Sequence, residues 1–534
     1  MVNPAVETIE HLVEVAIRLG GLDDVSLSSG ERVLAKRSKP VSVSCVRAFR
    51  DSMRQGDDPL GQNFSRLKSA AARRPLGATY TPKPLVTVMS QWVAEQVPQR
   101  VIDPGAGSGR FLVDAGRRLP KAHLVGIEMD PLAALMLRAH LKVAGLAKRS
   151  EVIVGDYCSA RLPRIDGVTA YLGNPPYVRH HGIAPERKVW FAEAARELGL
   201  PASKLAGLHL YFYVTTSRNS QSGDIGAFLT ASEWMDVNYG EFLRRLLLER
   251  LGLCSLHVLD PAAKPFDDAD TTAVVACFQV GQRHQNIRIR RAKAVDDIGS
   301  LNDGRPLTRT RFEACARWST LLHTQRRKPA GFIELGELCQ VHRGQVTGNN
   351  RIWIAGAHSS VLPEQFLFAT VTRARDLFAA GPELAHAGNL RCVIDIPANL
   401  DDVPRALRSE VEKFLKYARG MGAAQGYVAT HRRAWWSVGL REPAPILASY
   451  MARRAPAFVV NGARARHINI AHGIYPREAM PKQSLGVLVE YLRRSVSPED
   501  GRMYSGGLAK FEPKEMERLL IPGPSLLLAS SNCG

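Results

Sequence analysis

The residues best suited to chemistry are Asn174, Pro175, Pro176 and Tyr177, which follow the apolar run at 169–173. Each proline fixes its own backbone φ and restricts the residue before it, so this turn is rigid. The side-chain oxygen of Asn174 and the backbone oxygen of Pro175 can accept hydrogen bonds from an amine on a planar ring. Two such acceptors make the amine nitrogen more nucleophilic, and Tyr177 can stack on the ring.

A glycine-rich turn supplies a second group of candidate residues. The stretch "VIDPGAGSGRFLVDAG" at 101–116 has the pattern of a strand, a tight turn and a helix. Gly105, Gly107 and Gly109 let the backbone approach a ligand closely because they carry no Cβ. The spacing is neither the G-x-G-x-x-G of dinucleotide sites nor a P-loop. The turn alone is therefore compatible with a ligand site or with a purely structural role.

Three acidic residues stand at the ends of consecutive predicted strands. Asp103 ends the first, Glu128 ends the second in "GIEMDP", and Asp156 ends the third in "VGDY". Glu128 can accept hydrogen bonds from both hydroxyls of a ribose, and Asp156 can accept from an adenine amino group. Binding crevices of parallel sheets lie at the carboxyl ends of the strands, so the three acids predict a nucleoside site.

The elements that must position these residues alternate between strands and helices over residues 76–285. The predicted strands are "RVIDP", "HLVGIEMD", "EVIVGD", "GVTAYLGNPP", "DIGAFLTASEW", "LCSLHVLD" and "TAVVACFQV". This alternation predicts a parallel sheet with helices on both faces, antiparallel at its far edge, where the last two strands lack a helix between them. Residues 1–75 begin with an amphipathic helical pattern, residues 286–320 are interpreted as a linker, and residues 321–534 form a second block.

The amino-acid composition indicates the kind of binding partner and the cellular compartment to expect. Lys and Arg total 71 against 51 Asp and Glu, a formal charge of +20. A basic surface favours a polyanion such as nucleic acid, although a surplus that only aids solubility is the alternative. The 8 cysteines form no Cys-x-x-Cys pair, so neither a zinc site nor a disulfide framework is expected. The N-terminus is a poor signal peptide and no run is long enough to span a bilayer, so we expect a cytoplasmic protein.

The order of these motifs resembles that of the S-adenosylmethionine-dependent amino methyltransferases. The closest similarity is to the gamma-class, Taq-type DNA adenine-N6 methyltransferases, and it is strongest over residues 76–285. The resemblance implies a class I Rossmann-like domain with a mostly parallel seven-stranded sheet, followed by a mixed α/β target-recognition domain. It also implies S-adenosyl-L-methionine as cofactor and an adenine flipped out of duplex DNA as methyl acceptor, with no metal, no covalent nucleophile and no strong general base.

The resemblance also assigns roles to individual residues. In "GATYTPKPLVTVMSQWV", Tyr80, Thr81 and Pro82 take the places of a segment that binds the methionine end of the cofactor. The full implied cofactor set is Tyr80, Thr81, Pro82, Asp103, Pro104, Gly105, Gly107, Gly109, Glu128, Asp156 and Asn174. Phe266, in "PFDDADTTAVVACF", falls on the position that stacks on the target base opposite Tyr177; ordinary core packing is the alternative for both rings.

The C-terminal block resembles a target-recognition domain at both of its ends. These are "QVHRGQVTGNNRIWI" at 340–354 and "GRMYSGGLAKFEPKEMERLLIP" at 501–522. Basic clusters mixed with aromatics between them suit contacts with phosphates and DNA grooves, the alternative being a solvated surface. The candidate DNA contacts are Arg179, Arg343, Thr347, Asn349, Arg432, Arg433 and Lys510.

The expected protein is thus the modification enzyme of a prokaryotic restriction-modification or phage-defence system. We expect it to act on double-stranded DNA as a monomer associated with the nucleoid. No nuclease motif is evident, so a restriction or defence partner would be separately encoded. Three alternatives stay open: an RNA adenine methyltransferase, a protein-glutamine methyltransferase, and a non-catalytic DNA-binding subunit of a defence complex.

Overall fold

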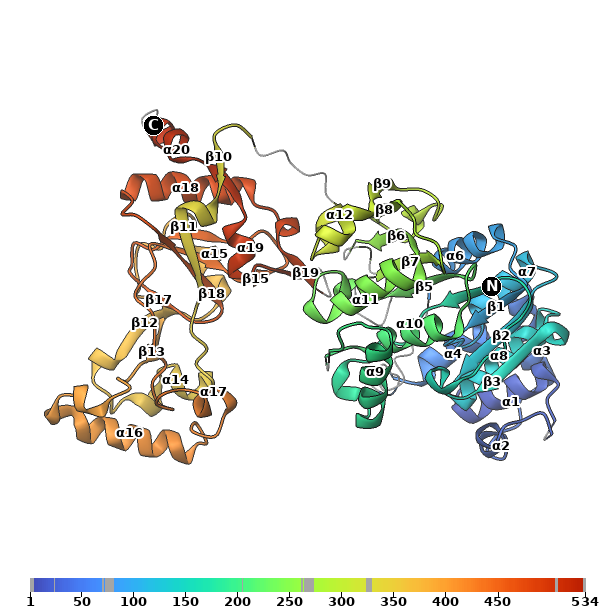
Figure 1. Cartoon of the computed structure of the whole chain (residues 1–534). Coiled ribbons are helices and arrows are strands. Elements are labelled where there is room, and N and C mark those ends of the chain that lie inside the picture. The colour runs from blue at the N-terminus through green and yellow to red at the C-terminus, as the bar shows by residue number, and fades with distance from the viewer. Residues whose placement is uncertain are drawn as a thin grey trace. The chain divides into compact units, whose positions relative to one another are not determined.

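The protein was analysed as a computed structural model, which describes residues 4–23, 25–69, 72, 81–203, 205–260, 263, 273–322, 329–504 and 508–531. The chain divides into two compact units (Figure 1), an N-terminal unit (Met1–Gln325) and a C-terminal unit (Arg326–Gly534). Among the described residues, no helix combines the length and the apolar character needed to cross a bilayer.

The N-terminal unit is built on a nine-stranded sheet with the strand order β3-β2-β1-β4-β5-β7-β6-β8-β9. The strands are β1 (Arg100–Asp103), β2 (His123–Glu128), β3 (Ser150–Val154), β4 (Thr169–Gly173), β5 (Ile225–Thr230), β6 (Leu253–Leu259), β7 (Ala273–Gln279), β8 (Asn286–Ala292) and β9 (Arg305–Thr308). Neighbours from β3 to β5 are parallel, and β7 is antiparallel to β5 and β6. The predicted mostly parallel sheet with an antiparallel far edge is therefore confirmed.

The sheet is larger than the seven strands that the resemblance implied, because the segment predicted to be a linker continues it. Strand β8 pairs with β6 in parallel and β9 pairs with β8 antiparallel. Ile287 and Ile289 are buried while Arg288 between them is exposed. The interpretation of 286–320 as a linker is wrong, because its arginines occupy one face of a strand whose other face packs on the core.

Helices cover both faces of the sheet, and successive residues of each strand contribute to opposite cores. Helices α6 (Lys83–Glu95) and α7 (Arg110–Arg118) share a hydrophobic cluster with Val101 and Leu172. Helices α9 (Pro185–Glu197), α10 (Leu208–Asn219) and α11 (Glu241–Leu246) share another with Ile102 and Tyr171. This alternation follows from the period of two along a strand.

The predicted helical extension at residues 1–75 forms an additional layer of the same unit. It contains α1 (Ile9–Gly20), α2 (Ser29–Ala35), α3 (Val43–Arg54) and α4 (Pro59–Leu67), which pack on α8 (Pro131–Val143). Arg138 of α8 donates to the fully buried carboxylate of Glu31 at 2.9 Å. The extension therefore shares a core with the sheet domain, and α8 is buried between the two.

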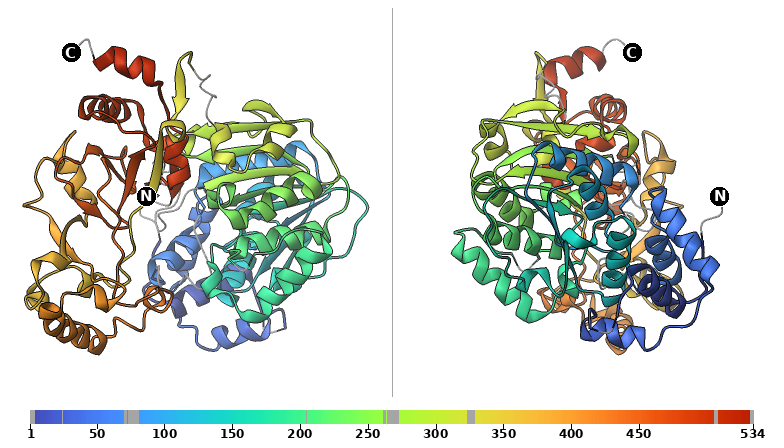
Figure 2. Two further views of the ribbon diagram at one scale, coloured as in Figure 1. Left: turned by 60° about the vertical axis from the view of Figure 1, so that its left-hand side comes forward. Right: turned by 90° about the vertical axis from the view of Figure 1, so that its right-hand side faces the viewer.

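The C-terminal unit is mixed α/β, as expected. Its largest sheet has four strands, β11 (Cys339–Arg343), β18 (Ala471–Pro476), β14 (Ile446–Ser449) and β16 (Phe458–Val460), and α18 (Lys482–Ser495) packs against it. Smaller sheets are formed by β13 (Arg391–Ile394), β12 (Leu367–Val371) and β17 (Arg466–His467), by β15 (Met451–Ala452), β20 (Leu508–Lys510) and β19 (Arg502–Tyr504), and by β10 (Phe332–Glu334) with β21 (Leu520–Pro522). Helix α16 (Arg408–Gly420) lies at the end of this unit away from α18 (Figure 2).

Candidate functional site

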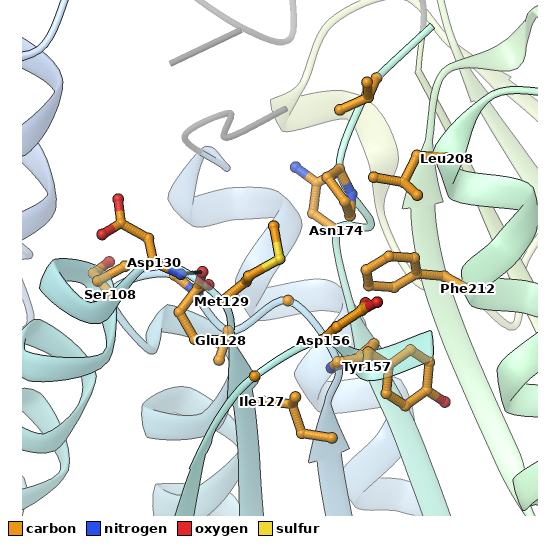
Figure 3. Close-up of a pocket in the computed structure, with 18 of the residues that line it drawn as sticks. Ser108, Ile127, Glu128, Met129, Asp130, Asp156, Tyr157, Asn174, Leu208 and Phe212 are labelled. Carbon is orange, nitrogen blue, oxygen red and sulfur yellow. Dashed lines mark hydrogen bonds between the residues drawn. The ribbon is translucent and has the colours of Figure 1, made fainter. Parts of the chain in front are cut away.

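A cavity of about 310 Å³ opens at the carboxyl ends of β1, β2, β3 and β4 (Figure 3). Its volume is at the lower end of the range for small-molecule sites. Eight of the residues expected at the site line it: Thr81, Pro104, Gly105, Gly107, Glu128, Asp156, Asn174 and Pro176. The sheet thus brings together residues from the glycine-rich turn, two of the three acids, and the Asn-Pro-Pro-Tyr turn.

Several expected residues lie elsewhere. Pro82, Asp103, Gly109, Pro175 and Tyr177 do not line the cavity. Tyr80 and Phe266 lie outside the described residues, so their roles stay predictions.

The glycine-rich turn places backbone, rather than side chains, against the cavity. Gly107 has φ +53° and Gly109 has φ +92°, a region that favours glycine. A Cβ at Gly107 would meet no atom within 4 Å, because that position faces open space. A Cβ at Gly109 would lie 2.5 Å from the Leu137 side chain, so this glycine permits close packing of the turn on α8.

Glu128 is fixed at the cavity wall by two backbone donors. Its carboxylate accepts from the N–H of Gly107 at 2.8 Å and from the N–H of Asp130 at 2.9 Å. Loss of hydration raises the pKa of Glu128, although both N–H groups act in the opposite direction. Each carboxylate oxygen keeps a further lone pair, so Glu128 can still accept from the hydroxyls of a ribose.

Asp103 lies behind the turn. It is 1 % exposed, and its Oδ1 accepts from the N–H of Gly105 at 3.2 Å. Burial raises the pKa of Asp103 to about 8, and the Glu128 charge adds to the effect. Its other oxygen, Oδ2, has no hydrogen-bond partner among the described residues. Asp103 therefore stabilises the glycine-rich turn through its hydrogen bond with Gly105.

Both carboxylate oxygens of Asp156 accept hydrogen bonds. Its Oδ1 accepts from the N–H of Cys158 at 3.1 Å, and its Oδ2 accepts from the guanidinium of Arg187 in α9. Arg187 also lines the cavity. Sequence reasoning missed Arg187, because no local motif marks a helical arginine whose partner lies on another element.

Part of the cavity lining is apolar. Leu208 and Phe212 of α10 line the cavity together with Ile127, and Phe212 packs on Tyr157 with ring centroids 5.3 Å apart (Figure 3). A lining that combines apolar side chains, carboxylates and a backbone turn suits a nucleoside with a charged tail. The residues present therefore fit S-adenosylmethionine.

The two ends of the Asn174 carboxamide differ in their hydrogen bonding. Its Nδ2 donates to the hydroxyl of Thr81 at 3.0 Å, whereas its Oδ1 is buried and has no partner among the described residues. Buried acceptors without partners are uncommon in folded proteins and occur at functional sites. The arrangement leaves the carbonyl end of the carboxamide available for a donor that the described chain does not supply.

Tyr177 contacts the protein core rather than the cavity. It is partly buried against the hydrophobic cluster that contains α6, and burial raises the pKa of its hydroxyl well above the ordinary value. Its stacking on a target base stays a prediction.

In the C-terminal unit, two of the candidate DNA contacts share one aromatic ring. The guanidinium carbon of Arg343 lies 4.8 Å from the ring centre of Tyr450, and the Lys510 ammonium lies 5.2 Å from it. Lys510 also pairs with Glu512. Sequence reasoning did not identify Tyr450, which brings together two cations far apart in the chain.

The other candidates differ in exposure. Arg179 and Arg433 are exposed, and Arg432 donates to the backbone oxygen of Val346. Asn349 caps the short helix α14 (Asn350–Trp353) by accepting from the N–H of Arg351 at 3.1 Å. Thr347 is only 3 % exposed and donates to the side chain of Asn350, so it stabilises this loop rather than presenting a hydroxyl to DNA. Within the described part of the chain, no cluster of His, Cys, Asp or Glu could hold a metal ion.

Comparisons with known proteins match both units. Residues 63–251 match the N-6 DNA Methylase family, and residues 319–532 match the family described as Type II methyltransferase M.Eco57I, C-terminal domain. The chain is 47% identical over 529 residues to the Type II methyltransferase M.XamI of Xanthomonas campestris pv. amaranthicola, covering 97% of this chain and 98% of that protein. It is 19% identical over 493 residues to the Type II methyltransferase M.AccI of Acinetobacter calcoaceticus, covering 88% of this chain and 90% of that protein.

A solved structure supports the fold. The Type IIL restriction-modification enzyme MmeI, determined in complex with DNA, aligns with a TM-score of 0.58 at 12% identity, covering 98% of this chain and 81% of that chain. At this identity the likeness concerns the fold alone.

Proposed function

Because the chain belongs to the type II methyltransferases of restriction-modification systems and contains an N-6 DNA methylase domain, we propose that it methylates the N6 amino group of a flipped-out adenine at a specific site in duplex DNA. The cofactor is S-adenosylmethionine, which when bound supplies an electrophilic methyl group on a sulfonium. The proposal concerns the target atom and the residues that act on it.

The observation that carries the proposal is the buried Oδ1 of Asn174, which accepts no hydrogen bond from the residues that the structure describes. Leaving a buried acceptor without a partner costs about 1–3 kcal/mol. The exocyclic amine of adenine would remove this cost by donating one of its two hydrogens. Because Nδ2 is already bonded to Thr81, the carboxamide is oriented to accept rather than to donate.

The second hydrogen of the amine would be accepted by the backbone oxygen of Pro175, as the sequence predicts. With both N–H groups held, the nitrogen lone pair is localised and directed at the methyl carbon. On transfer, N6 would bond to the methyl carbon as the carbon–sulfur bond breaks and S-adenosylhomocysteine leaves. N6 would then carry a positive charge, the methyl group and its two original hydrogens, one of which must leave as a proton. The two acceptors stabilise the developing positive charge, and the proton then passes to water.

Extrusion of the adenine from the duplex costs about a few kcal/mol. Stacking on Tyr177 and Phe266, at about 1–3 kcal/mol for each aromatic face, would offset that cost. The Pro175-Pro176 segment keeps the backbone rigid between the acceptor and the aromatic ring.

We further propose that the C-terminal unit recognises the DNA sequence. The cations around Tyr450 and the exposed Arg433 supply positive charge for phosphate contacts. The sequence shows no nuclease motif, so a restriction partner would be a separate protein, and the enzyme would act as a monomer.

Long-read sequencing of DNA from cells that express the wild-type protein or the Asn174→Ala variant tests the function. We expect N6-methyladenine at one recurring sequence with the wild-type protein and none with the variant. In parallel, labelled cofactor would be incubated with duplex DNA, total RNA or release-factor protein. Labelling of RNA or of protein in place of DNA, or of cytosine in DNA, would contradict the proposal.

A further inference from the structure

One helix of the N-terminal extension, α4, contributes to the cofactor cavity. Gly61, Phe64 and Ser65 of α4 line it beside the glycine-rich turn. Neither the resemblance nor the amphipathic pattern of residues 1–75 pointed to this. The match to the N-6 DNA Methylase family begins at residue 63, so the N-cap residue of α4 lies before it.

That residue is Asp58, and its carboxylate is surrounded by donors. It is 1 % exposed. Its Oδ1 caps α4 by accepting from the N–H of Gly61 at 2.8 Å, and its Oδ2 accepts from the Ser108 hydroxyl of the glycine-rich turn. The Nε of Arg110, the first residue of α7, lies 3.7 Å from Oδ2. Asp58 thus joins the extension to the turn and to α7.

The contacts continue from Arg110 to the reaction centre. The Arg110 guanidinium donates to the backbone oxygen of Thr81, whose hydroxyl accepts from Asn174. The Arg110 side chain is only 15 % exposed, so its interactions are weakly screened by water. A continuous series of hydrogen bonds and one ion pair therefore runs from Asp58 to the Asn174 carboxamide.

We propose that Asp58 is a positioning residue that orients the Asn174 carboxamide through Arg110 and Thr81. The proposal rests on the proposed function, because it assumes that Asn174 accepts from the target amine. By fixing Arg110, Asp58 fixes the backbone of Thr81 and so the place where its hydroxyl meets Nδ2. With Nδ2 held there, Oδ1 is the end of the carboxamide left for the substrate.

The packing of α4 supports the contact between Asp58 and the glycine-rich turn. A Cβ at Gly61 would lie 2.4 Å from Oδ2 of Asp58 and 3.0 Å from the Ser108 hydroxyl oxygen, so only glycine permits this approach. The other end of α4 is tied to the same cavity: Lys68 pairs with Asp130 at 2.9 Å and lies 4.7 Å from the ring centre of Phe64. Asp130 also lines the cavity.

The test is a double-mutant cycle on the full-length protein. Asp58→Asn keeps the shape and the helix cap but weakens the ion pair with Arg110, and Thr81→Val keeps the shape but removes the hydroxyl. The single-turnover methylation rate is measured at saturating S-adenosylmethionine, alongside the melting temperature and the dissociation constant of S-adenosylhomocysteine. The matched control is Asp57→Asn, which changes the exposed neighbour of Asp58.

We expect each single variant to lose about 10- to 100-fold in rate, the range associated with misplacement of a catalytic group. The double variant should be no slower than the slower single variant, because both changes interrupt one series of contacts. Asp57→Asn should keep the wild-type rate. If Asp58→Asn unfolds, Arg110→Lys, which retains the charge but loses the planar fork, should show the same loss in rate.

A wild-type rate in Asp58→Asn, or losses that multiply in the double variant, would overturn the positioning role. The failure of the proposed function would look different. In that case Asn174→Ala would remain active, whatever the Asp58 variant does.

Discussion

The raised pKa of Asp103 predicts a pH-dependent stability that a single substitution removes. Burial raises the pKa of Asp103 from 3.8 to about 8. Between these values the folded protein holds a proton that the unfolded chain has released. The contribution of Asp103 to the free energy of unfolding is therefore fully present below pH 4, falls by about 1.4 kcal/mol per pH unit, and is lost as the pH rises through 8.

Asp103→Asn removes this titration and closely matches the shape of the protonated acid. Relative to wild type, the variant should gain about 3 kcal/mol in the free energy of unfolding between pH 5 and pH 7. Glu128 is present in both proteins, so its own titration largely cancels. Because the folded wild-type protein holds the proton, the difference in free energy of unfolding favours the variant more as the pH rises, and it levels off above pH 8.

The assay is the melting temperature of the ligand-free protein from pH 5 to pH 9, measured for wild type, Asp103→Asn and Asp166→Asn. Asp166 is exposed, so its variant controls for the loss of one carboxylate from the surface. The difference between Asp103→Asn and wild type should rise with pH, whereas the Asp166→Asn difference should stay flat. A constant difference, or one that falls with pH, would refute the assignment of a buried, protonated Asp103.

Three further predictions concern the cavity and the C-terminal unit. Gly107→Ala places a methyl group in the open space of the cavity, so S-adenosylmethionine should bind at least about 10-fold more weakly by calorimetry, and the melting temperature should fall modestly because alanine is strained at φ +53°; unchanged affinity would exclude contact with this turn. Gly61→Ala inserts a Cβ 2.4 Å from Asp58, so both melting temperature and cofactor affinity should fall, and a wild-type affinity would show that α4 is not needed at the site. Arg343→Ala should lower the slope of log Kd for duplex DNA against log salt concentration by about 1 if Arg343 contacts a phosphate near Tyr450, and an unchanged slope would place it off the DNA.

Strand order explains why the sequence could predict that these residues gather at one edge of the sheet. Asp103 and Glu128 end β1 and β2, Asp156 follows the end of β3 by two residues, and parallel pairing brings those ends to one edge. The turn glycines and Asn174 could be recognised in the same way, since the turn lies between β1 and α7 and Asn174 directly follows β4.

Other parts of the site could not be predicted from strand order, because they depend on packing between elements that are distant in the sequence. Phe64, Arg187 and Phe212 reach the cavity from three helices, and no local pattern distinguishes them from ordinary helical residues. Strand β8 was missed for another reason: its arginines alternate with buried isoleucines, and the high charge concealed the period of two.

The most direct test of the central claim is a comparison of cofactor affinity and methyl-transfer rate in Asn174→Ala. We expect the dissociation constant for S-adenosylhomocysteine to change by less than about 10-fold, while the single-turnover rate on duplex DNA falls by about 100-fold or more, in line with the loss of a preorganised hydrogen-bonding group. A variant that transfers methyl groups at close to the wild-type rate would contradict the claim that the carboxamide oxygen of Asn174 accepts a hydrogen bond from the target amine.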